Sequence, residues 1–153
     1  MEACIFPPTK ERGVKVLKVT PNVYIDRSDF SEESISGFFG VMPGQVVCLR
    51  YGPFVLMEDI VKDSSGKITA VKVKVIPNHT EKVKGVIQWV AQEHSIPAQV
   101  RLYNELLTCE NEKEESKKTG KKWTDFVNPE SLIVKDDARV WDFMGDSKEF
   151  DRF

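Results

Sequence analysis

The sequence predicts an all-β fold, and three observations carry that prediction. Short apolar stretches rich in valine and isoleucine recur along the chain, separated by glycine, proline, asparagine or aspartate. The clearest stretch, residues 70–75, alternates valine with lysine, the period of two of a strand with one buried face. Helical periodicity is scarce. Many short strands joined by such turns are typical of β-barrels or a β-sandwich.

The first predicted strands cover residues 14–19 and 23–25, and the break Thr20-Pro21-Asn22 separates them. Proline removes a backbone donor and interrupts a ladder at this point. No stretch repeats elsewhere in the chain, so we expect a single arrangement of strands rather than a repeat protein. The other predicted strands cover residues 46–49, 54–56, 70–75, 85–90, 100–103 and 131–134.

Two local predictions depend on turn and cap chemistry. Residues 54–76 predict a hairpin, because the polar stretch 63–67 contains the glycine that a tight turn needs. Residues 31–39 predict a short helix, since Ser31 can cap its start and the two glutamates that follow suit its first turn.

Residues 110–122 differ from the rest because they contain no apolar side chain. Such a segment has nothing to bury, so we expect a solvated or disordered loop. Its lysines (Lys117, Lys118, Lys121 and Lys122) could touch nucleic-acid phosphates. The simpler interpretation is a mixed-charge surface loop, because four glutamates lie beside them.

The composition indicates a globular protein without strong charge. The chain has 153 residues, of which 41% are hydrophobic and 30% charged, and its formal net charge is −2. Nucleic-acid domains commonly carry a basic excess, so any basic surface here must be local. No apolar run is long enough to span a membrane. The three cysteines, Cys4, Cys48 and Cys109, form no CxxC pair, which favours buried thiols and a reducing cytoplasm over disulfides or zinc.

Catalytic motifs are missing from the sequence. Only two histidines occur, His79 and His94, and there is no phosphate-binding loop, nucleophile elbow or HExxH pattern. The acid pairs Asp26/Asp29 and Glu32/Glu33 lie where turns and caps are expected. The residues themselves therefore indicate a binding module without catalytic residues or a metal site.

A candidate binding surface combines basic and aromatic side chains near strand ends. Arginine can pair with a phosphate or a base edge, and an aromatic ring can stack on an unpaired base. This combination suits single-stranded loop RNA, although aromatic residues in β proteins are more often core. The basic candidates are Arg27, Arg50, Lys82, Lys84 and Arg101, and the aromatic ones are Tyr24, Phe38, Phe39, Tyr51, Trp89 and Tyr103.

Six blocks of sequence, in order, resemble the glutaminyl-tRNA synthetase family. Val100-Arg101-Leu102-Tyr103 with the four residues that follow resembles the family's VRLYDRLF, and residues 82–90 resemble KVKGVIHWV. The remaining blocks are 23–30 (like IDRADF), 43–50 (like PGxEVRLR), 94–97 (like HALP) and 125–132 (like DFLxxINPESL). The proline pair after Phe6 and residues 150–153 resemble the family's flanking segments more loosely.

The resemblance implies two antiparallel β-barrels in tandem that read the anticodon loop of tRNA(Gln). The outer barrel would be one continuous insertion, residues 40–122. The inner barrel would be built from residues 1–39 and 123–153, and we expect it to be incomplete.

The resemblance also implies the activity of a longer protein. The family joins glutamine to tRNA with ATP and magnesium, in a catalytic domain with HIGH-like and KMSKS-like signatures. Neither signature occurs in this sequence, so this chain should bind no cofactor and catalyse nothing alone. The abrupt ends suggest a fragment, and we expect either a partly disordered inner barrel or pairing of unpaired strand edges between two copies.

The family's RNA-contacting positions carry over unevenly. Arg50 matches the second arginine of the family's RLR, whereas Cys48 replaces the first and cannot grip a phosphate. Many relatives carry basic residues where this chain has Phe39-Gly40, so a usual reader of the third anticodon base is missing.

Arg50 is the first candidate for tRNA binding, and Arg27, Lys82 and Arg101 follow it. Each of the latter has a structural alternative. Arg27 could pair with Asp29 at a turn, Lys82 could be merely solvated, and Arg101 could cover apolar surface with its stem.

Three other functions stay open. A glutamate-specific eukaryotic relative shares the barrel plan but differs in the blocks at residues 23–30 and 100–103. A non-enzymatic RNA-binding barrel, such as a ribosomal protein of the 5S-rRNA-binding type, would not need the six blocks. A protein-interaction module could use the same barrel surface.

Overall fold

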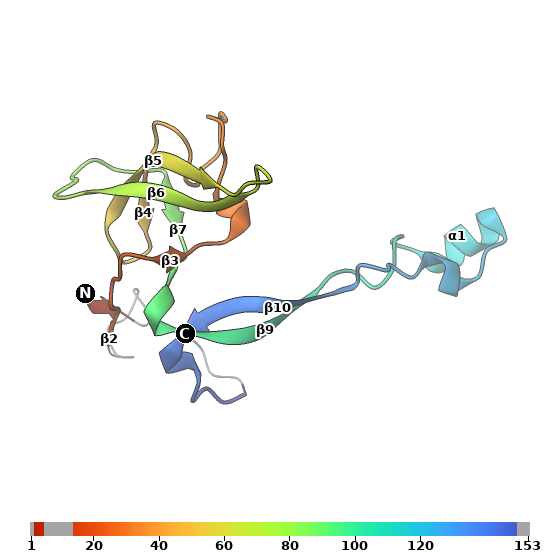
Figure 1. Cartoon of the computed structure of the whole chain (residues 1–153). Helices are drawn as coiled ribbons and strands as arrows, with labels where there is room; N and C mark the ends of the chain where they lie inside the picture. The colour runs from red at the N-terminus through yellow and green to blue at the C-terminus, as the bar shows by residue number, and fades with distance from the viewer. Residues whose placement is uncertain (1, 5–13, 150–153) are drawn as a thin grey trace. The chain divides into compact units, whose positions relative to one another are not determined.

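The computed structural model describes residues 2–4 and 14–149, and these are mostly strands (Figure 1). The predicted all-β class is confirmed. The chain divides into two compact units, residues 1–95 with 141–153 and residues 96–140. The predicted flanking segments at Phe6 and at residues 150–153 lie outside the described residues.

Each predicted strand has a counterpart, and all except the strand at residues 46–49 have shifted ends. The strands are β1 Glu2–Cys4, β2 Val14–Val16, β3 Val23–Tyr24, β4 Val46–Leu49, β5 Phe54–Lys62, β6 Ile68–Ile76, β7 Gly85–Ile87, β8 Val90–Ala91, β9 Ser95–Tyr103 and β10 Leu132–Trp141. Within residues 14–149, the helices are α1 Glu112–Thr119 and the short 3-10 turns η2 Arg27–Asp29, η3 Gln92–His94, η4 Trp123–Phe126 and η5 Asp142–Met144.

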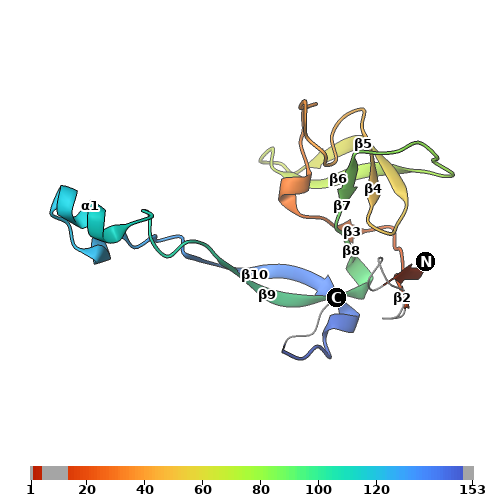
Figure 2. The ribbon, with the colours of Figure 1, turned by 180° about the vertical axis from the view of Figure 1, so that it is seen from behind.

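The first unit is organised around a four-stranded sheet in the order β6-β5-β4-β7, in which β4 and β7 are parallel. Two further ladders have two strands each: β3 pairs with β8 (Figure 2), and β1 pairs with β2. The sheets of the described residues are open, so the two-barrel arrangement and its boundaries stay predictions. The core consists of Leu17, Phe30, Val41, Val47, Leu49, Val55, Ile87, Trp89 and Ala91.

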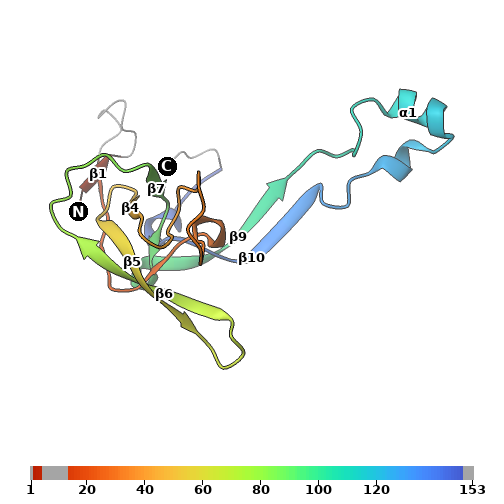
Figure 3. The same cartoon turned by 90° about the horizontal axis from the view of Figure 1, so that it is seen from above.

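The predicted hairpin is confirmed as β5 and β6, and it extends beyond the other strands of its sheet (Figure 3). The turn of the hairpin lies at residues 63–67, as predicted. Asp63 donates its N–H to the Lys67 carbonyl over 2.8 Å, and Gly66 has a φ of 84°, which other residues rarely adopt. The carboxylate of Asp63 accepts hydrogen bonds from Ser65 and from the N–H of Lys67. The valines of β6 do not form the buried face that the alternating sequence predicts, because Val75 is 52% exposed.

The hydrogen bonds of Asp63 should make the free energy of unfolding decrease at acid pH. The Ser65 hydroxyl and then the Lys67 N–H lower the pKa of Asp63 below its ordinary 3.8. A lowered carboxyl pKa adds stability above the unfolded-state pKa, and this stability is lost as pH falls through the folded-state pKa. We expect Asp63→Asn to lower the urea midpoint of unfolding near pH 7 and to match the parent well below pH 3.8. Glu58→Gln on β5 is the charge-matched control, and a pH-independent Asp63→Asn effect would contradict the linkage.

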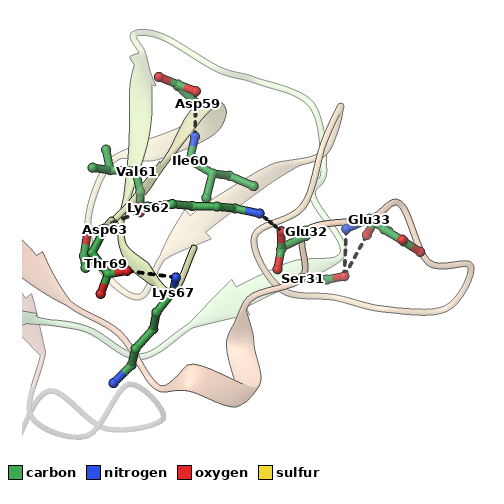
Figure 4. A network of polar contacts seen from close by, with 10 residues as sticks. All are labelled: Ser31, Glu32, Glu33, Asp59, Ile60, Val61, Lys62, Asp63, Lys67 and Thr69. Carbon is green, nitrogen blue, oxygen red and sulfur yellow. Dashed lines mark hydrogen bonds and ion pairs between the residues drawn. The ribbon is translucent and has the colours of Figure 1, made fainter. Parts of the chain in front are cut away.

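The predicted helix over residues 31–39 is wrong, because this segment forms bends and turns. Ser31 does accept the N–H of Glu33, but its hydroxyl also donates to the carbonyl of Glu33, which closes a local turn. An ion pair of 2.7 Å between Lys62 of β5 and Glu32 ties this loop to the hairpin (Figure 4). A short segment with few apolar anchors gains little from helix formation.

The second unit contains the paired strands β9 and β10 (Figure 1). Between these two strands, the chain forms short connections, the helix α1 and the turn η4. Side-chain amides fasten its connections, since Asn104 donates to the Glu130 carbonyl and Asn128 to the Glu105 carbonyl. None of its described residues is buried.

The loop predicted over residues 110–122 is corrected to the helix α1. Asn111 caps its start by accepting the N–H of Glu114, and Gly120 ends it with a φ of 70°. Acids occupy the first turn and lysines the last, which complements the helix dipole, and Lys118 pairs with Glu115. The expectation of solvation holds, because no residue of α1 is buried. Within the described ranges, no helix is long and apolar enough to cross a membrane.

Candidate nucleic-acid interface

Arg50 directly follows β4, and its backbone is fixed on both sides. Its N–H donates to the carbonyl of Ile87 over 2.9 Å, and its carbonyl accepts the indole N–H of Trp89 over 2.9 Å. Both partners belong to the core. The exposed side chain of Arg50 is therefore carried by a backbone that cannot easily move.

The guanidinium of Arg50 lies over the ring of Tyr51, with its central carbon 5.3 Å from the ring centroid. This distance is within the range of a cation–π contact. Tyr51 is 39% exposed, so the pair forms part of the surface. The arrangement joins a donor of several hydrogen bonds to an aromatic ring, the two groups that unpaired bases and phosphates bind.

Cys48 lies two residues before Arg50, half-buried in β4. Its thiol donates to the carbonyl of Leu49 over 3.4 Å, and burial raises its pKa. The neutral thiol is thus the dominant form near neutral pH, and Cys48 brings no positive charge to the site. This supports the expectation that Cys48 cannot replace an arginine in gripping a phosphate.

Arg27 belongs to the 3-10 turn η2, where it stabilises the local fold. Its guanidinium donates to the carbonyl of Phe30 over 3.1 Å and lies 5.1 Å from the centroid of that ring. The alternative pairing with Asp29 is wrong, since no ion pair among the described residues joins the two. Partial burial, followed by the nearby charge of Asp26, raises the pKa of Asp29. The Asp26 side chain caps the turn by accepting from Ser28.

Gly40, one of the two residues where the resemblance led us to expect a basic side chain, is enclosed by backbone. Gly40 is buried, and an added Cβ would lie 2.6 Å from the carbonyl carbon of Asp29 and closer still to its oxygen. The same atom would lie 2.6 Å from the ring of Phe38. The side-chain amide of Gln45 donates to the Gly40 carbonyl over 2.9 Å and to the Phe38 carbonyl over 3.2 Å, which holds this segment in place. Phe39 beside it is 54% exposed.

Lys82 and Lys84 lie in the connection between β6 and β7, and both are exposed. Neither forms a hydrogen bond or ion pair with another residue that the structure describes. Their charges are therefore available to an anion.

Arg101 lies on β9 in the second unit, whereas the other basic candidates belong to the first unit. Its Nε donates to the Gln99 side chain over 2.8 Å, and Gln99 donates in turn to Asp136 of β10 over 2.6 Å. This chain of polar contacts across the ribbon gives Arg101 a structural task, although its side chain remains exposed.

Most of the candidate aromatic residues are exposed, and one interpretation is corrected. Trp89 is only 4% exposed and packs edge-on against Trp141 at 5.0 Å. It supports the Arg50 turn from beneath and offers no face to RNA. Four of the remaining candidates reach solvent: Tyr24, Phe39, Tyr51 and Tyr103.

Sequence reasoning missed a shallow pocket in the first unit. His94 Nδ1 lies 3.1 Å from a carboxylate oxygen of Asp142, and Trp141 stacks against Phe143 beside them. Val16 and Lys18 also line this pocket, whose volume is about 350 Å³. His94 looked isolated because its partner is 48 residues away, and no spacing in the sequence announces that pair.

These features define an all-β binding module that presents an arginine–tyrosine pair on a rigid turn. Two family descriptions match the chain, both reading "tRNA synthetases class I (E and Q), anti-codon binding domain", over residues 1–76 and 86–153. The chain belongs to this family of anticodon-binding domains, which confirms the resemblance seen in the six blocks.

The curated relatives named below are all glutamine–tRNA ligases. The chain is 35% identical to a glutamine–tRNA ligase of Neisseria meningitidis over 138 residues, which is 85% of the chain and 25% of that protein. It is 34% identical to one of Cupriavidus metallidurans over 159 residues, 99% of the chain and 26% of the relative. The match to Stutzerimonas stutzeri is 35% over 153 residues, 95% and 27% respectively. The chain thus spans about a quarter of the length of these relatives.

Proposed function

We propose that this chain recognises the anticodon loop of tRNA(Gln) as part of a glutamine–tRNA ligase. The family match over residues 1–76 and 86–153 carries this proposal, and the named relatives favour glutamine over glutamate. The rigid presentation of Arg50 supports it independently, because a fixed arginine loses little freedom when it binds.

Recognition would work through splayed, unpaired bases. The Arg50 guanidinium offers paired N–H donors that can meet a phosphate or the acceptor edge of a base. A wrong base leaves such donors buried without a partner, at about 1–3 kcal/mol for each group. Arg27, Lys82 and Arg101 are further tRNA-binding candidates of the same proposal, and Lys82 is the most available of the three.

The remaining predictions belong to the same proposal. The two-barrel plan, 40–122 within 1–39 and 123–153, would shape the anticodon pockets. ATP-dependent joining of glutamine to tRNA would occur in the part of the longer protein that this chain does not match, in the cytoplasm. We also propose that copies of this chain pair through exposed strand edges at high concentration.

Titration with anticodon stem–loop RNA tests the function. We expect loops with anticodon CUG or UUG to bind more tightly than loops of the same length with swapped anticodons. The observed affinity should fall with salt, because contacts to single-stranded phosphates release counterions. Equal and salt-insensitive binding to every loop would reject anticodon recognition.

Replacing Arg50 by glutamine is expected to weaken binding of the CUG loop about tenfold or more, the effect of losing one charged hydrogen-bonding group. Fluorescence anisotropy of labelled RNA measures this change. Lys74→Gln, which removes one positive charge from an exposed position of β6, is the matched control and should leave discrimination intact. Equal losses in the two variants would show that Arg50 contributes only general charge.

A further inference from the structure

The turn after β4 contains a strained aromatic residue. Tyr51 has a φ of 61°, in the left-handed region. An aromatic side chain is a genuine outlier there, because its Cβ crowds the following carbonyl. Asn78, with a φ of 55°, is the other non-glycine residue of the described chain in this region, and asparagine tolerates it well. A tyrosine at position 51 therefore needs an explanation that asparagine at position 78 does not.

Packing does not explain the tyrosine. Its residue is 39% exposed, and it is absent from the core cluster and from the side chains packed against it. The ring contact that the described residues show is with the guanidinium of Arg50 at 5.3 Å. Insertion of the ring into the core is therefore not what offsets the strain of this backbone.

The surrounding turn prevents the strain from relaxing. Gly52 donates its N–H to the Leu49 carbonyl over 2.5 Å, and the Leu49 N–H donates to the Pro53 carbonyl over 3.0 Å. A Cβ on Gly52 would lie 3.3 Å from the indole of Trp89, so the turn rests closely on the core. Together with the two hydrogen bonds of the Arg50 backbone, these contacts fix the backbone of Tyr51 and so the point from which its ring projects. Strain held by such surroundings is commonly associated with functional positions.

We infer that Tyr51 is a base-stacking residue, and that its ring and the Arg50 guanidinium together hold one unpaired nucleobase of the RNA. This inference rests on the proposed function and deepens it. The guanidinium orients the ring and supplies donors beside it, and the exposed part of the ring supplies a π-face that any base can stack on. Stacking sets affinity at this position, whereas the Arg50 donors read the base edge or its phosphate.

The test uses Tyr51→Asn, which keeps a side chain suited to the left-handed backbone and removes the ring. We expect its urea unfolding midpoint to equal or exceed that of the parent, while affinity for the CUG stem–loop falls about tenfold. Tyr51→Phe keeps the ring and should bind like the parent. Asn78→Gly, the control at the second left-handed position, should leave affinity unchanged.

A fluorescent base supplies a readout that a purely structural role would not move. With 2-aminopurine substituted in turn at each anticodon position, saturating parent protein should quench one position by stacking, and Tyr51→Asn should not. Parent-like affinity or a lower unfolding midpoint in Tyr51→Asn would overturn the stacking role while leaving anticodon recognition in place. Loss of discrimination between cognate and swapped loops in the parent itself would instead remove the proposed function, and the stacking site with it.

Discussion

Replacing Trp89 by alanine is expected to lower the free energy of unfolding of the first unit by about 3–5 kcal/mol, the range for large aromatic side chains removed from a core. Trp89 is 4% exposed, packs against Trp141 at 5.0 Å, and belongs to the main core cluster. Its loss leaves a cavity and also leaves the Arg50 carbonyl without its indole donor. Urea unfolding followed by the methyl NMR signals of Val47, a fully buried residue, measures the change.

Trp123→Ala is the control for this experiment, because Trp123 is 59% exposed. A surface truncation of this kind changes stability by about 0.5 kcal/mol at most. Trp89→Phe separates the two roles of the indole, since it keeps an aromatic ring but removes the N–H that binds the Arg50 carbonyl. We expect it to remain folded and to bind the CUG stem–loop more weakly than the parent. Unchanged stability in Trp89→Ala would contradict the core position of this residue.

The strands could be predicted from the sequence because short-range features, namely alternating apolar residues and turn residues, determine where they form. The hairpin β5–β6 follows from alternating valines and from Gly66, the turn residue that adopts a positive φ. The helix α1 was missed because its causes are caps and charge placement, without any apolar face. The capping residue Asn111 and the terminal Gly120 are present in the sequence, but a cap and a terminal glycine without apolar periodicity between them do not predict a helix.

The candidate site could be predicted only in part, because its geometry depends on distant residues. Arg50 was selected from a motif, yet what fixes it is an indole 39 residues later in the chain. Trp89 was counted among surface aromatics, since sequence alone does not distinguish a ring beneath a turn from a ring upon it. The left-handed backbone of Tyr51 likewise arises from the closure of the turn against the core and leaves no signal in residue order.

Introducing arginine at Gly40, in the Phe39-Gly40 pair where the family resemblance implies a basic side chain, is expected to destabilise the first unit by about 2–3 kcal/mol rather than to improve RNA binding. The first atom of any side chain there would meet the backbone of Asp29, and backbone cannot swing aside as a flexible side chain can. The Asp29 carbonyl also accepts the N–H of Val41 over 2.7 Å, next to the bridge between Phe30 and Val41. Relief of the clash would therefore disturb two core residues, which urea unfolding would reveal.

Phe39→Lys places the missing charge one residue earlier, where the side chain is 54% exposed. This variant should unfold within about 0.5 kcal/mol of the parent. If the loop faces RNA, the new lysine should tighten binding of the CUG stem–loop and steepen its salt dependence by about 0.7 in log–log slope for one added contact to single-stranded phosphate. A Gly40→Arg protein as stable as the parent would refute the close approach of the Asp29 backbone. A Phe39→Lys protein with an unchanged salt slope would instead place the RNA away from this loop, and would leave Arg50, Arg27 and Lys82 as the candidate basic contacts of the first unit.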